Sequence, residues 1–238
     1  MHSPANVYAV NTGDKLYLVD TGTGAFAASF PGTELGHLGE ALAAANIARD
    51  DVDAILLTHL HPDHFGGLVA GRDALFPRAE IIVPEADTKF WLSTEVAAQA
   101  PADAKPFFDM ARSAMTPYES RTRKIAPNGP VIPGIEAIAL PGHTVGHTAY
   151  MIGSGNDRLL IWGDIVHNAA LQFPRPDLTI PYDTDQPQAA ASRKRAFDIA
   201  ATDRIMIAGM HLPFPGLGHV ERDGERYAYH PVSWTPKY

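Results

Sequence analysis

The 238-residue chain contains no cysteine. This absence excludes disulfides and thiolate metal sites. Histidine, aspartate and glutamate are therefore the strong metal ligands that the chain has available. The absence of cysteine does not indicate a cellular compartment.

Long apolar runs are also missing. No run approaches the roughly 18 apolar residues of a membrane span. The opening hexapeptide, Met1-His2-Ser3-Pro4-Ala5-Asn6, lacks a basic region followed by an apolar one. We therefore expect a soluble protein with no membrane partner, cytoplasmic as the sequence stands and periplasmic or secreted if a leader has been removed.

Basic residues are scarce, with 19 Lys and Arg against 27 Asp and Glu and a net charge of -8. Such a chain repels polyanions on average, so nucleic acid is not an expected partner. The length and the 45% hydrophobic content suit one domain. We expect a single domain over 1–238, with halves of about 1–128 and 129–238 and a small-molecule partner; a homodimer stays open.

Residue periodicity predicts strands alternating with helices. Expected strands and hairpins are Asn6–Asn11 with Lys15–Asp20, Asp53–Thr58, Glu80–Pro84, Ile135–Leu140, Ala149–Ile152 with Arg158–Trp162, Arg204–Ala208, and His219–Arg222 with Arg226–His230. Expected helices are Leu35–Ala48, Glu85–Ala98, Ala102–Met115 and Ala189–Ala201. Gly22–Gly36 and Ala169–Tyr182 are expected to be irregular, the first either as an aromatic loop over a pocket or as an exposed, disordered turn.

Four metal-binding side chains crowd into the six residues His59-Leu60-His61-Pro62-Asp63-His64, directly after the expected strand Asp53–Thr58. Three imidazoles and a carboxylate at this spacing repel one another on protonation and are costly to bury unless a cation lies among them. In open α/β sheets, ligands bind at the carboxyl ends of strands. The stretch therefore predicts a metal-binding loop.

This stretch resembles the His-x-His-x-Asp-His motif of the metallo-β-lactamase superfamily. Three further residues lie in the contexts where that family has ligands, each after an apolar strand: His143, Asp164 and His211. The resemblance implies a four-layer αββα fold, an α/β (α+β) class with two mixed β-sheets and outer helices.

The resemblance also implies the distribution of ligands. His59, His61 and His143 would hold one ion, Asp63, His64 and His211 the other, and Asp164 would bridge the two. Ligands of nitrogen and oxygen make zinc the default, with iron, manganese or cobalt as alternatives. Two such ions would generate a bridging hydroxide that attacks the substrate, and Asp63 would carry the proton to the leaving group.

Other residues are expected to support the site or to contact substrate. Asp20, Thr58 and His147 are predicted to orient the ligands from behind. The predicted pocket wall consists of Phe65, Trp91, His167, Phe173 and Phe214, whose rings suit flat acyl or aryl groups.

The scaffold hosts several chemistries, and departures from pattern narrow them. A redox di-iron member would have Glu at His61, a glyoxalase-type thioesterase would end in a helical domain, an RNA-processing member would be basic, and a true β-lactamase would lack the Asp164 bridge. The branch that contains methyl parathion hydrolase and lactone and aryl-ester hydrolases is most similar, through Phe90–Ser93, Gly163–His167, Ala170–Phe173 and His211–His219. Relatives carry an additional strand segment before Asn6, so this chain is either truncated or naturally short.

We therefore expect a dinuclear metal-dependent hydrolase of lactones and aryl esters. His167 lies where organophosphate-degrading relatives carry an aliphatic residue, and a polar wall favours a compact carbonyl over a bulky phosphotriester. Organophosphate triester hydrolysis is the alternative, and a non-catalytic metal-binding scaffold is a remote one. The sequence leaves open the physiological substrate, the native metal and the oligomeric state.

Overall fold

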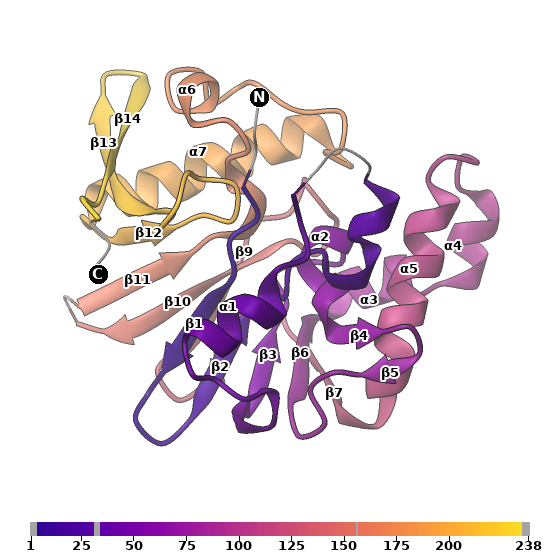
Figure 1. The fold of residues 1–238 in the computed structure, drawn as a ribbon. Helices are drawn as coiled ribbons and strands as arrows, with labels where there is room; N and C mark the ends of the chain where they lie inside the picture. The colour runs from indigo at the N-terminus through magenta and orange to yellow at the C-terminus, as the bar shows by residue number, and fades with distance from the viewer. Residues whose placement is uncertain (1–3, 31–33, 156, 235–238) are drawn as a thin grey trace. The chain divides into compact units, whose positions relative to one another are not determined.

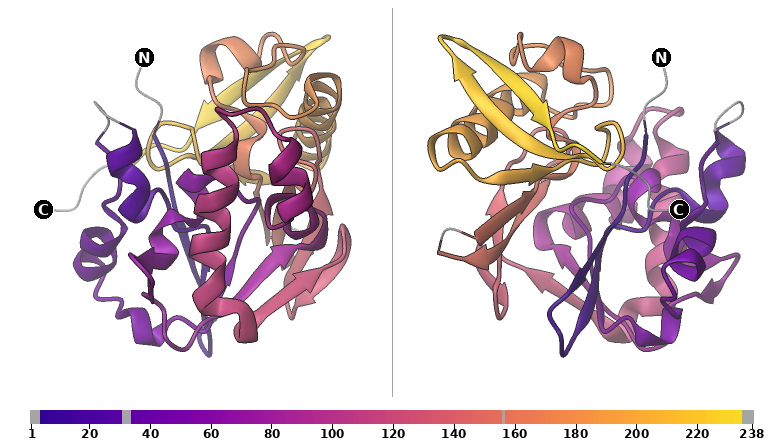
Figure 2. Two further views of the ribbon diagram at one scale, coloured as in Figure 1. Left: turned by 90° about the vertical axis from the view of Figure 1, so that its right-hand side faces the viewer. Right: turned by 60° about the vertical axis from the view of Figure 1, so that its left-hand side comes forward.

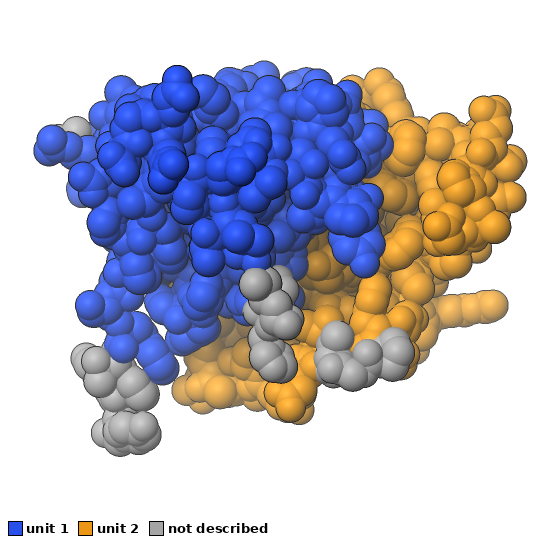
Figure 3. Space-filling view, turned by 90° about the horizontal axis from the view of Figure 1, so that it is seen from above, with its two compact units in different colours: residues 1–6, 126–238 blue, residues 7–125 orange. Residues whose placement is uncertain are grey.

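The computed structural model describes residues 4–30, 34–155 and 157–234 (Figure 1). The chain forms two compact units, coloured separately in Figure 3. The first, here called the amino-terminal unit, is Val7–Ile125. The second, the carboxy-terminal unit, comprises the described residues of Met1–Asn6 and Ala126–Tyr238. No helix in the described ranges is long and apolar enough to cross a membrane.

The amino-terminal unit is built on a five-stranded mixed sheet of order β1-β2-β3-β6-β7. Its strands are β1 (Tyr8–Asn11), β2 (Leu16–Val19), β3 (Ala54–Leu56), β6 (Glu80–Pro84) and β7 (Thr122–Ile125). The predicted hairpin between β1 and β2 is confirmed, and the other neighbouring strands are parallel. The helix α1 (Leu38–Ala44) connects β2 to β3, as the sequence predicted.

Short helices and one small ribbon complete this unit. They are α2 (Pro62–Phe65), α3 (Glu85–Trp91), α4 (Thr94–Gln99), α5 (Lys105–Met115), the 3-10 helices η1 (Gly24–Ser29), η2 (Arg49–Asp51), η3 (Gly66–Leu68) and η4 (Thr116–Arg121), and the strands β4 (Val69–Ala70) and β5 (Asp73–Ala74). Helices α3, α4 and α5 contact one another and stand together in magenta and pink in Figure 2. A core of aliphatic and aromatic side chains from the sheet and these helices, including Leu18, Ile55 and Phe108, is fully or almost fully buried.

Two predictions for this unit are wrong. The expected single helix Glu85–Ala98 is two helices, because Ser93 has extended backbone and its side-chain oxygen accepts a hydrogen bond from the backbone N–H of Val96. Ser93 is thus an N-cap that begins α4. The segment Gly22–Gly36 is not wholly irregular, since η1 lies within it; residues 31–33 of that segment are outside the described residues.

The carboxy-terminal unit contains a seven-stranded mixed sheet of order β14-β13-β12-β11-β10-β9-β8. Its strands are β8 (Asn128–Ile132), β9 (Ile135–Ala139), β10 (Thr148–Ser154), β11 (Asp157–Ile161), β12 (Met206–Ala208), β13 (Leu217–Asp223) and β14 (Arg226–Pro231). The helical elements are η5 (Gly163–Ile165), α6 (Ala169–Gln172) and α7 (Gln186–Thr202). Helix α7 packs against β13, and its Phe197 lies in the buried core with Trp162.

The prediction for Ala169–Tyr182 is wrong in its first four residues. They form α6, which begins where the Asn168 side chain accepts a hydrogen bond from the N–H of Leu171. The remaining predicted strands of this unit and helix α7 are confirmed, with bounds shifted by a few residues. Mixed sheets with helices in both units agree with the two mixed sheets that the sequence predicted.

The strand directions bring three loops to one edge of the carboxy-terminal sheet. Strand β10 is antiparallel to both β9 and β11, and β11 is parallel to β12. Strands β9, β11 and β12 therefore run in the same direction. Their carboxyl ends, followed by His143, Asp164 and His211 respectively, meet at the same edge.

Candidate metal centre

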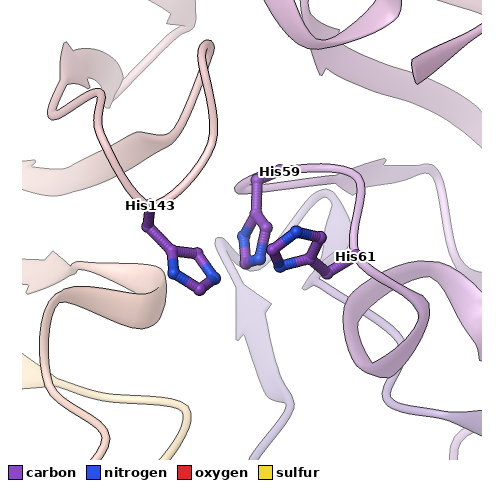
Figure 4. Close-up of side chains that lie close together, drawn as sticks. All are labelled: His59, His61 and His143. Atoms are coloured by element: carbon purple, nitrogen blue, oxygen red, sulfur yellow. The ribbon is translucent and has the colours of Figure 1, made fainter. Parts of the chain in front are cut away.

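In the amino-terminal unit the metal-binding stretch follows β3 directly. His59 and His61 lie on the connecting loop (Figure 4), and Pro62 opens the single-turn helix α2, which carries Asp63 and His64. The ring centroids of His59 and His61 are 4.8 Å apart, and those of His59 and His64 are 4.0 Å apart. The Asp63 Oδ2 atom lies 3.5 Å from His64 Nε2. The four candidate ligands of this stretch are therefore close together in space.

Asp20 supports this stretch from the carboxyl end of the neighbouring strand β2. Its Oδ1 accepts from the backbone N–H of Thr58 at 2.7 Å, and its Oδ2 accepts from the Thr58 hydroxyl at 2.8 Å. The same Oδ2 lies 2.8 Å from His64 Nδ1. A carboxylate can only accept, so His64 carries its proton on Nδ1 and presents the lone pair of Nε2.

Thr58 passes the same constraint on to His59. The Thr58 hydroxyl has one proton, which it donates to Asp20, and its oxygen lies 2.9 Å from His59 Nδ1. That oxygen must accept from Nδ1, so His59 also presents Nε2. One carboxylate thus fixes the tautomers of two imidazoles, in agreement with the supporting roles that the sequence predicted for Asp20 and Thr58.

Backbone geometry shows how tightly the loop is held. Asp20 adopts φ 62°, a left-handed conformation that Asp tolerates better than most residues. The N–H of Leu60 donates to the Oδ2 of the fully buried Asp87 at 2.7 Å. A Cβ on Gly66 would collide with the carbonyl of Thr23, so this close approach of two backbones requires glycine. Asp87 was missed from the sequence because nothing in its local pattern distinguishes it from a surface residue of α3.

In the carboxy-terminal unit three imidazoles surround one carboxylate oxygen. The Nε2 atoms of His143, His167 and His211 lie 3.2, 3.1 and 3.1 Å from Asp164 Oδ2. The side chains of His143, Asp164 and His211 are almost fully buried. Figure 4 shows His143 on the loop that follows β9. His143, Asp164 and His167 form a set that could hold a metal ion.

Two of these imidazoles have acceptors behind them. His143 Nδ1 lies 2.9 Å from the Oδ1 of Asp183, and His211 Nδ1 lies 2.6 Å from the carbonyl oxygen of Pro4. Both residues therefore carry the Nδ1 proton and present Nε2. Asp183 was missed from the sequence, because it lies 40 positions from His143 in an irregular segment.

His147 uses both of its ring nitrogens inside the protein. Nε2 accepts from the backbone N–H of Asp164 at 2.9 Å, which leaves Nδ1 to donate to the carbonyl of Leu140 at 3.0 Å. His147 precedes β10, which lies between β9 and β11 in the sheet. It thereby ties the loop after β9 to the loop after β11. This arrangement agrees with a supporting role and not with a ligand role.

Comparison with known proteins agrees with this geometry. The model of the metallo-β-lactamase superfamily matches residues 2–211. The chain belongs to this superfamily. The fold class predicted from the sequence is thereby confirmed.

Solved structures similar to the chain include the hydrolase AbOPH of the β-lactamase superfamily, at 34% identity and a TM-score of 0.90, covering 98% of this chain and 81% of that one. AidC, a dizinc quorum-quenching lactonase solved with a product, shows 29% identity and a TM-score of 0.88 over 98% of this chain and 80% of that one. A probable metal-dependent hydrolase from Staphylococcus aureus shares the fold at 21% identity and a TM-score of 0.78, covering 96% of this chain and 82% of that one. The search of curated proteins found no match.

The residues in each unit fit the divalent metals that this superfamily usually binds. Imidazole and carboxylate ligands without sulfur suit zinc and its neighbours. The hydrogen bonds described above point four imidazoles to Nε2 coordination, as is usual for metal-binding histidines with an acceptor on the other nitrogen. The distribution of the seven ligands over two ions stays a prediction.

The pKa values of one candidate ligand, His143, and of two carboxylates behind the ligands, Asp183 and Asp20, are shifted by burial and by neighbouring groups. Burial by itself would lower the pKa of His143, but the hydrogen bonds and charges of Asp164 and Asp183 outweigh it and raise the pKa to about 9. Burial would raise the pKa of Asp183, but the hydrogen bond from His143 dominates the opposing effects, and the pKa is lowered. Burial raises the pKa of Asp20 despite the opposing effect of His64.

The predicted pocket residues lie in different environments. Phe65 and Phe173 are buried, and Phe173 stacks on Phe197 with ring centroids 4.7 Å apart. The Trp91 ring packs edge-on against His61, with centroids 5.2 Å apart. Phe214 is 67% exposed. Contact with substrate stays a prediction for all of them.

His167 lies beside the candidate ligands. Its ring stacks on that of His211 with centroids 4.8 Å apart, and its backbone N–H donates to Gln172 Oε1. Burial lowers its pKa against the opposing effect of Asp164. Its Nδ1 atom is buried without a hydrogen-bond partner among the described residues. His167 therefore places a polar ring beside Asp164. From the sequence, this ring is predicted to affect substrate selectivity.

Proposed function

We propose that the chain is a dinuclear metal-dependent hydrolase of lactones and aryl esters. The single observation that carries the proposal is the preorganised presentation of imidazole Nε2 atoms in both units, each backed by an acceptor on Nδ1. Ligands held in this way need little reorganisation to bind a cation. We propose that His59, His61 and His143 would hold one ion, that Asp63, His64 and His211 would hold the other, and that Asp164 would be a ligand to both.

Two divalent ions, when bound, would lower the pKa of a water molecule toward neutrality and polarise a substrate carbonyl. The chain's own residues would orient the ligands and move the proton. Asp20, Thr58 and Asp183 hold imidazole tautomers, and His147 holds the backbone of Asp164. The Asp63 side chain is 30% exposed, which suits a group that must take a proton from the attacking water and pass it to the leaving alkoxide.

The substrate class is supported by similarity and by polarity. AidC, to which the chain is 29% identical, is a dizinc quorum-quenching lactonase. The polar His167 beside Asp164 favours a compact ester or lactone carbonyl over a phosphotriester with apolar arms. Phosphotriester hydrolysis is the second candidate, on the sequence likeness to the branch that contains methyl parathion hydrolase.

The test is a hydrolysis panel of lactones, aryl esters, phosphotriesters, thioesters and β-lactams. Metal-free protein is reconstituted with zinc, iron, manganese or cobalt, and each form is assayed with the whole panel. We expect turnover of lactones and aryl esters that is lost on metal removal. Asp53→Asn, at the amino-terminal end of β3 and so at the opposite end of the strand from the metal-binding loop, serves as the control variant with unchanged activity.

The panel also separates the competing interpretations. A clear preference for a β-lactam or a thioester would contradict the assignment. Metal binding without turnover of any substrate would favour the non-catalytic scaffold instead. A preference for phosphotriesters would favour the second candidate.

A further inference from the structure

Helix α7 carries a buried arginine that the function described so far does not use. Arg193 is 1% exposed and lies in the middle of a helix whose outer face is polar. Burial of an arginine is costly unless its guanidinium is fully engaged by hydrogen bonds and a counter-charge. The groups that contact the guanidinium therefore indicate the role of Arg193.

Three backbone carbonyls fix the guanidinium in place. Nε donates to Ile165 at 2.6 Å, and Nη1 donates to Pro176 at 3.0 Å and to Leu178 at 2.6 Å. All three carbonyls belong to the connection between β11 and α7, which has little regular structure apart from η5 and α6. The rigid fork of donors thus replaces the hydrogen bonds that this connection lacks.

The remaining arm of the guanidinium faces Asp183. Arg193 Nη2 lies 4.0 Å from Asp183 Oδ2, and both side chains are excluded from solvent. The same Oδ2 accepts from the backbone N–H of Ile180 at 3.0 Å, while Oδ1 faces His143 Nδ1 at 2.9 Å. Asp183 is therefore held between an arginine on one side and a candidate metal ligand on the other.

We propose that Arg193 is a positioning residue for the metal centre: it holds Asp183, and Asp183 holds the His143 imidazole with Nε2 directed to the metal. This inference rests on the proposed function. A residue behind a ligand usually changes metal affinity about 10- to 100-fold when it is replaced. Lysine cannot reproduce the fork that hydrogen-bonds three carbonyls and still places positive charge 4.0 Å from the Asp183 carboxylate, so arginine is specifically required.

The test measures metal affinity by competition with a chelator, which does not depend on substrate. Arg193→Met keeps an unbranched apolar side chain and removes the guanidinium fork, and we expect it to weaken binding of one ion about tenfold or more. Phe197→Leu, in the same helix and core, is the matched control for lost stability, because Phe197 makes aromatic contacts and no polar ones. It should lower the melting temperature of the metal-free protein and leave metal affinity unchanged.

A double-mutant cycle tests whether the effect passes through Asp183. In an Asp183→Asn background, Arg193→Met should weaken binding by much less than in the wild type. The downfield N–H resonance of the His143 ring should be lost in either single variant and retained in Phe197→Leu.

Three results would overturn the inference. In the first, Arg193→Met lowers stability as Phe197→Leu does but binds metal as tightly as the wild type. In the second, the effects of Arg193→Met and Asp183→Asn on metal affinity are additive in the cycle. A wild-type protein that binds no metal would overturn the proposed function together with the inference, so the two failures are distinguishable.

Discussion

Asp20 Oδ2 lies 2.8 Å from His64 Nδ1, and both side chains are buried. Asp20 directly follows β2 and His64 lies on α2, 44 positions apart in the sequence. The same oxygen also accepts from the Thr58 hydroxyl, which in turn accepts from His59 Nδ1. This one carboxylate therefore sets the tautomers of two of the three histidines in the stretch. Preorganisation of the ligands therefore depends on a residue that is itself not expected to touch the metal.

Asp20→Asn is predicted to weaken metal binding about 10- to 100-fold. Asparagine tolerates the left-handed backbone of this position, so the fold should survive the change. Its amide has one accepting oxygen in place of the two of Asp20, and an NH2 group facing His64 would move the imidazole proton to Nε2. Chelator competition measures the affinity, with Asp53→Asn as the control for loss of a carboxylate in the same unit. Equal affinities in the two variants would contradict the role given to Asp20.

His147→Ala is predicted to destabilise the metal-free protein by about 1 to 3 kcal/mol, because the N–H of Asp164 and the carbonyl of Leu140 lose their buried partner. Urea unfolding gives the free energy, and His230→Ala, at an exposed histidine, is the control. Loss of one ion per chain at unchanged stability would show instead that His147 is a ligand.

The pKa of His143 predicts how the metal-free protein responds to pH. Its value of about 9 lies above the ordinary 6.5, so its protonated form stabilises the fold. That contribution is fully present below about pH 6.5 and is lost as the pH rises through about 9. Metal affinity should change in the opposite sense and rise with pH, because a ligand must release its proton.

Urea unfolding and chelator competition across this pH range measure both trends. His143→Gln should remove most of the alkaline loss of stability. A metal-free protein whose stability rises between pH 6.5 and 9, with no difference in His143→Gln, would contradict the prediction.

The sequence was sufficient for the elements whose signal is local. The motif around His59 to His64 and the strands before His143, Asp164 and His211 are contiguous patterns, and the structure places these side chains at strand ends as expected. The hairpin of β1 and β2 follows from simple alternation of polar and apolar residues. Such features depend on few residues and hardly at all on tertiary packing.

What the sequence could not provide depends on contacts between distant residues. Asp183 and Arg193 have no local motif, and their roles arise only when the connection from β11 packs on α7. The break between α3 and α4 depends on one residue, Ser93, which is the N-cap of α4. In the sequence, Phe173 is an apolar residue of the same kind whether its ring packs in the core on Phe197 or lines a substrate pocket. Only its position in the structure distinguishes a core role from a pocket role.

His167→Leu is predicted to raise the ratio of phosphotriester to lactone kcat/KM by about tenfold, equivalent to about 1.4 kcal/mol in relative transition-state binding. The substitution removes a polar ring beside Asp164 and adds apolar surface without removing an expected ligand. His219→Leu makes the same chemical change at an exposed position and is the control. An unchanged ratio would place His167 away from substrate, and loss of both activities together with metal would make it a support of the ligands.

The central claim is the proposal that the seven predicted ligands hold two ions and that these ions are required for hydrolysis. The most direct measurement is lactone turnover by metal-free protein as zinc is added in known equivalents, in parallel with elemental analysis of the wild type and of Asp164→Ala. We predict that turnover rises to a plateau at about two ions per chain, and that Asp164→Ala lowers both occupancy and rate. Turnover without metal, or an Asp164→Ala variant that retains two tightly held ions and wild-type turnover, would contradict it.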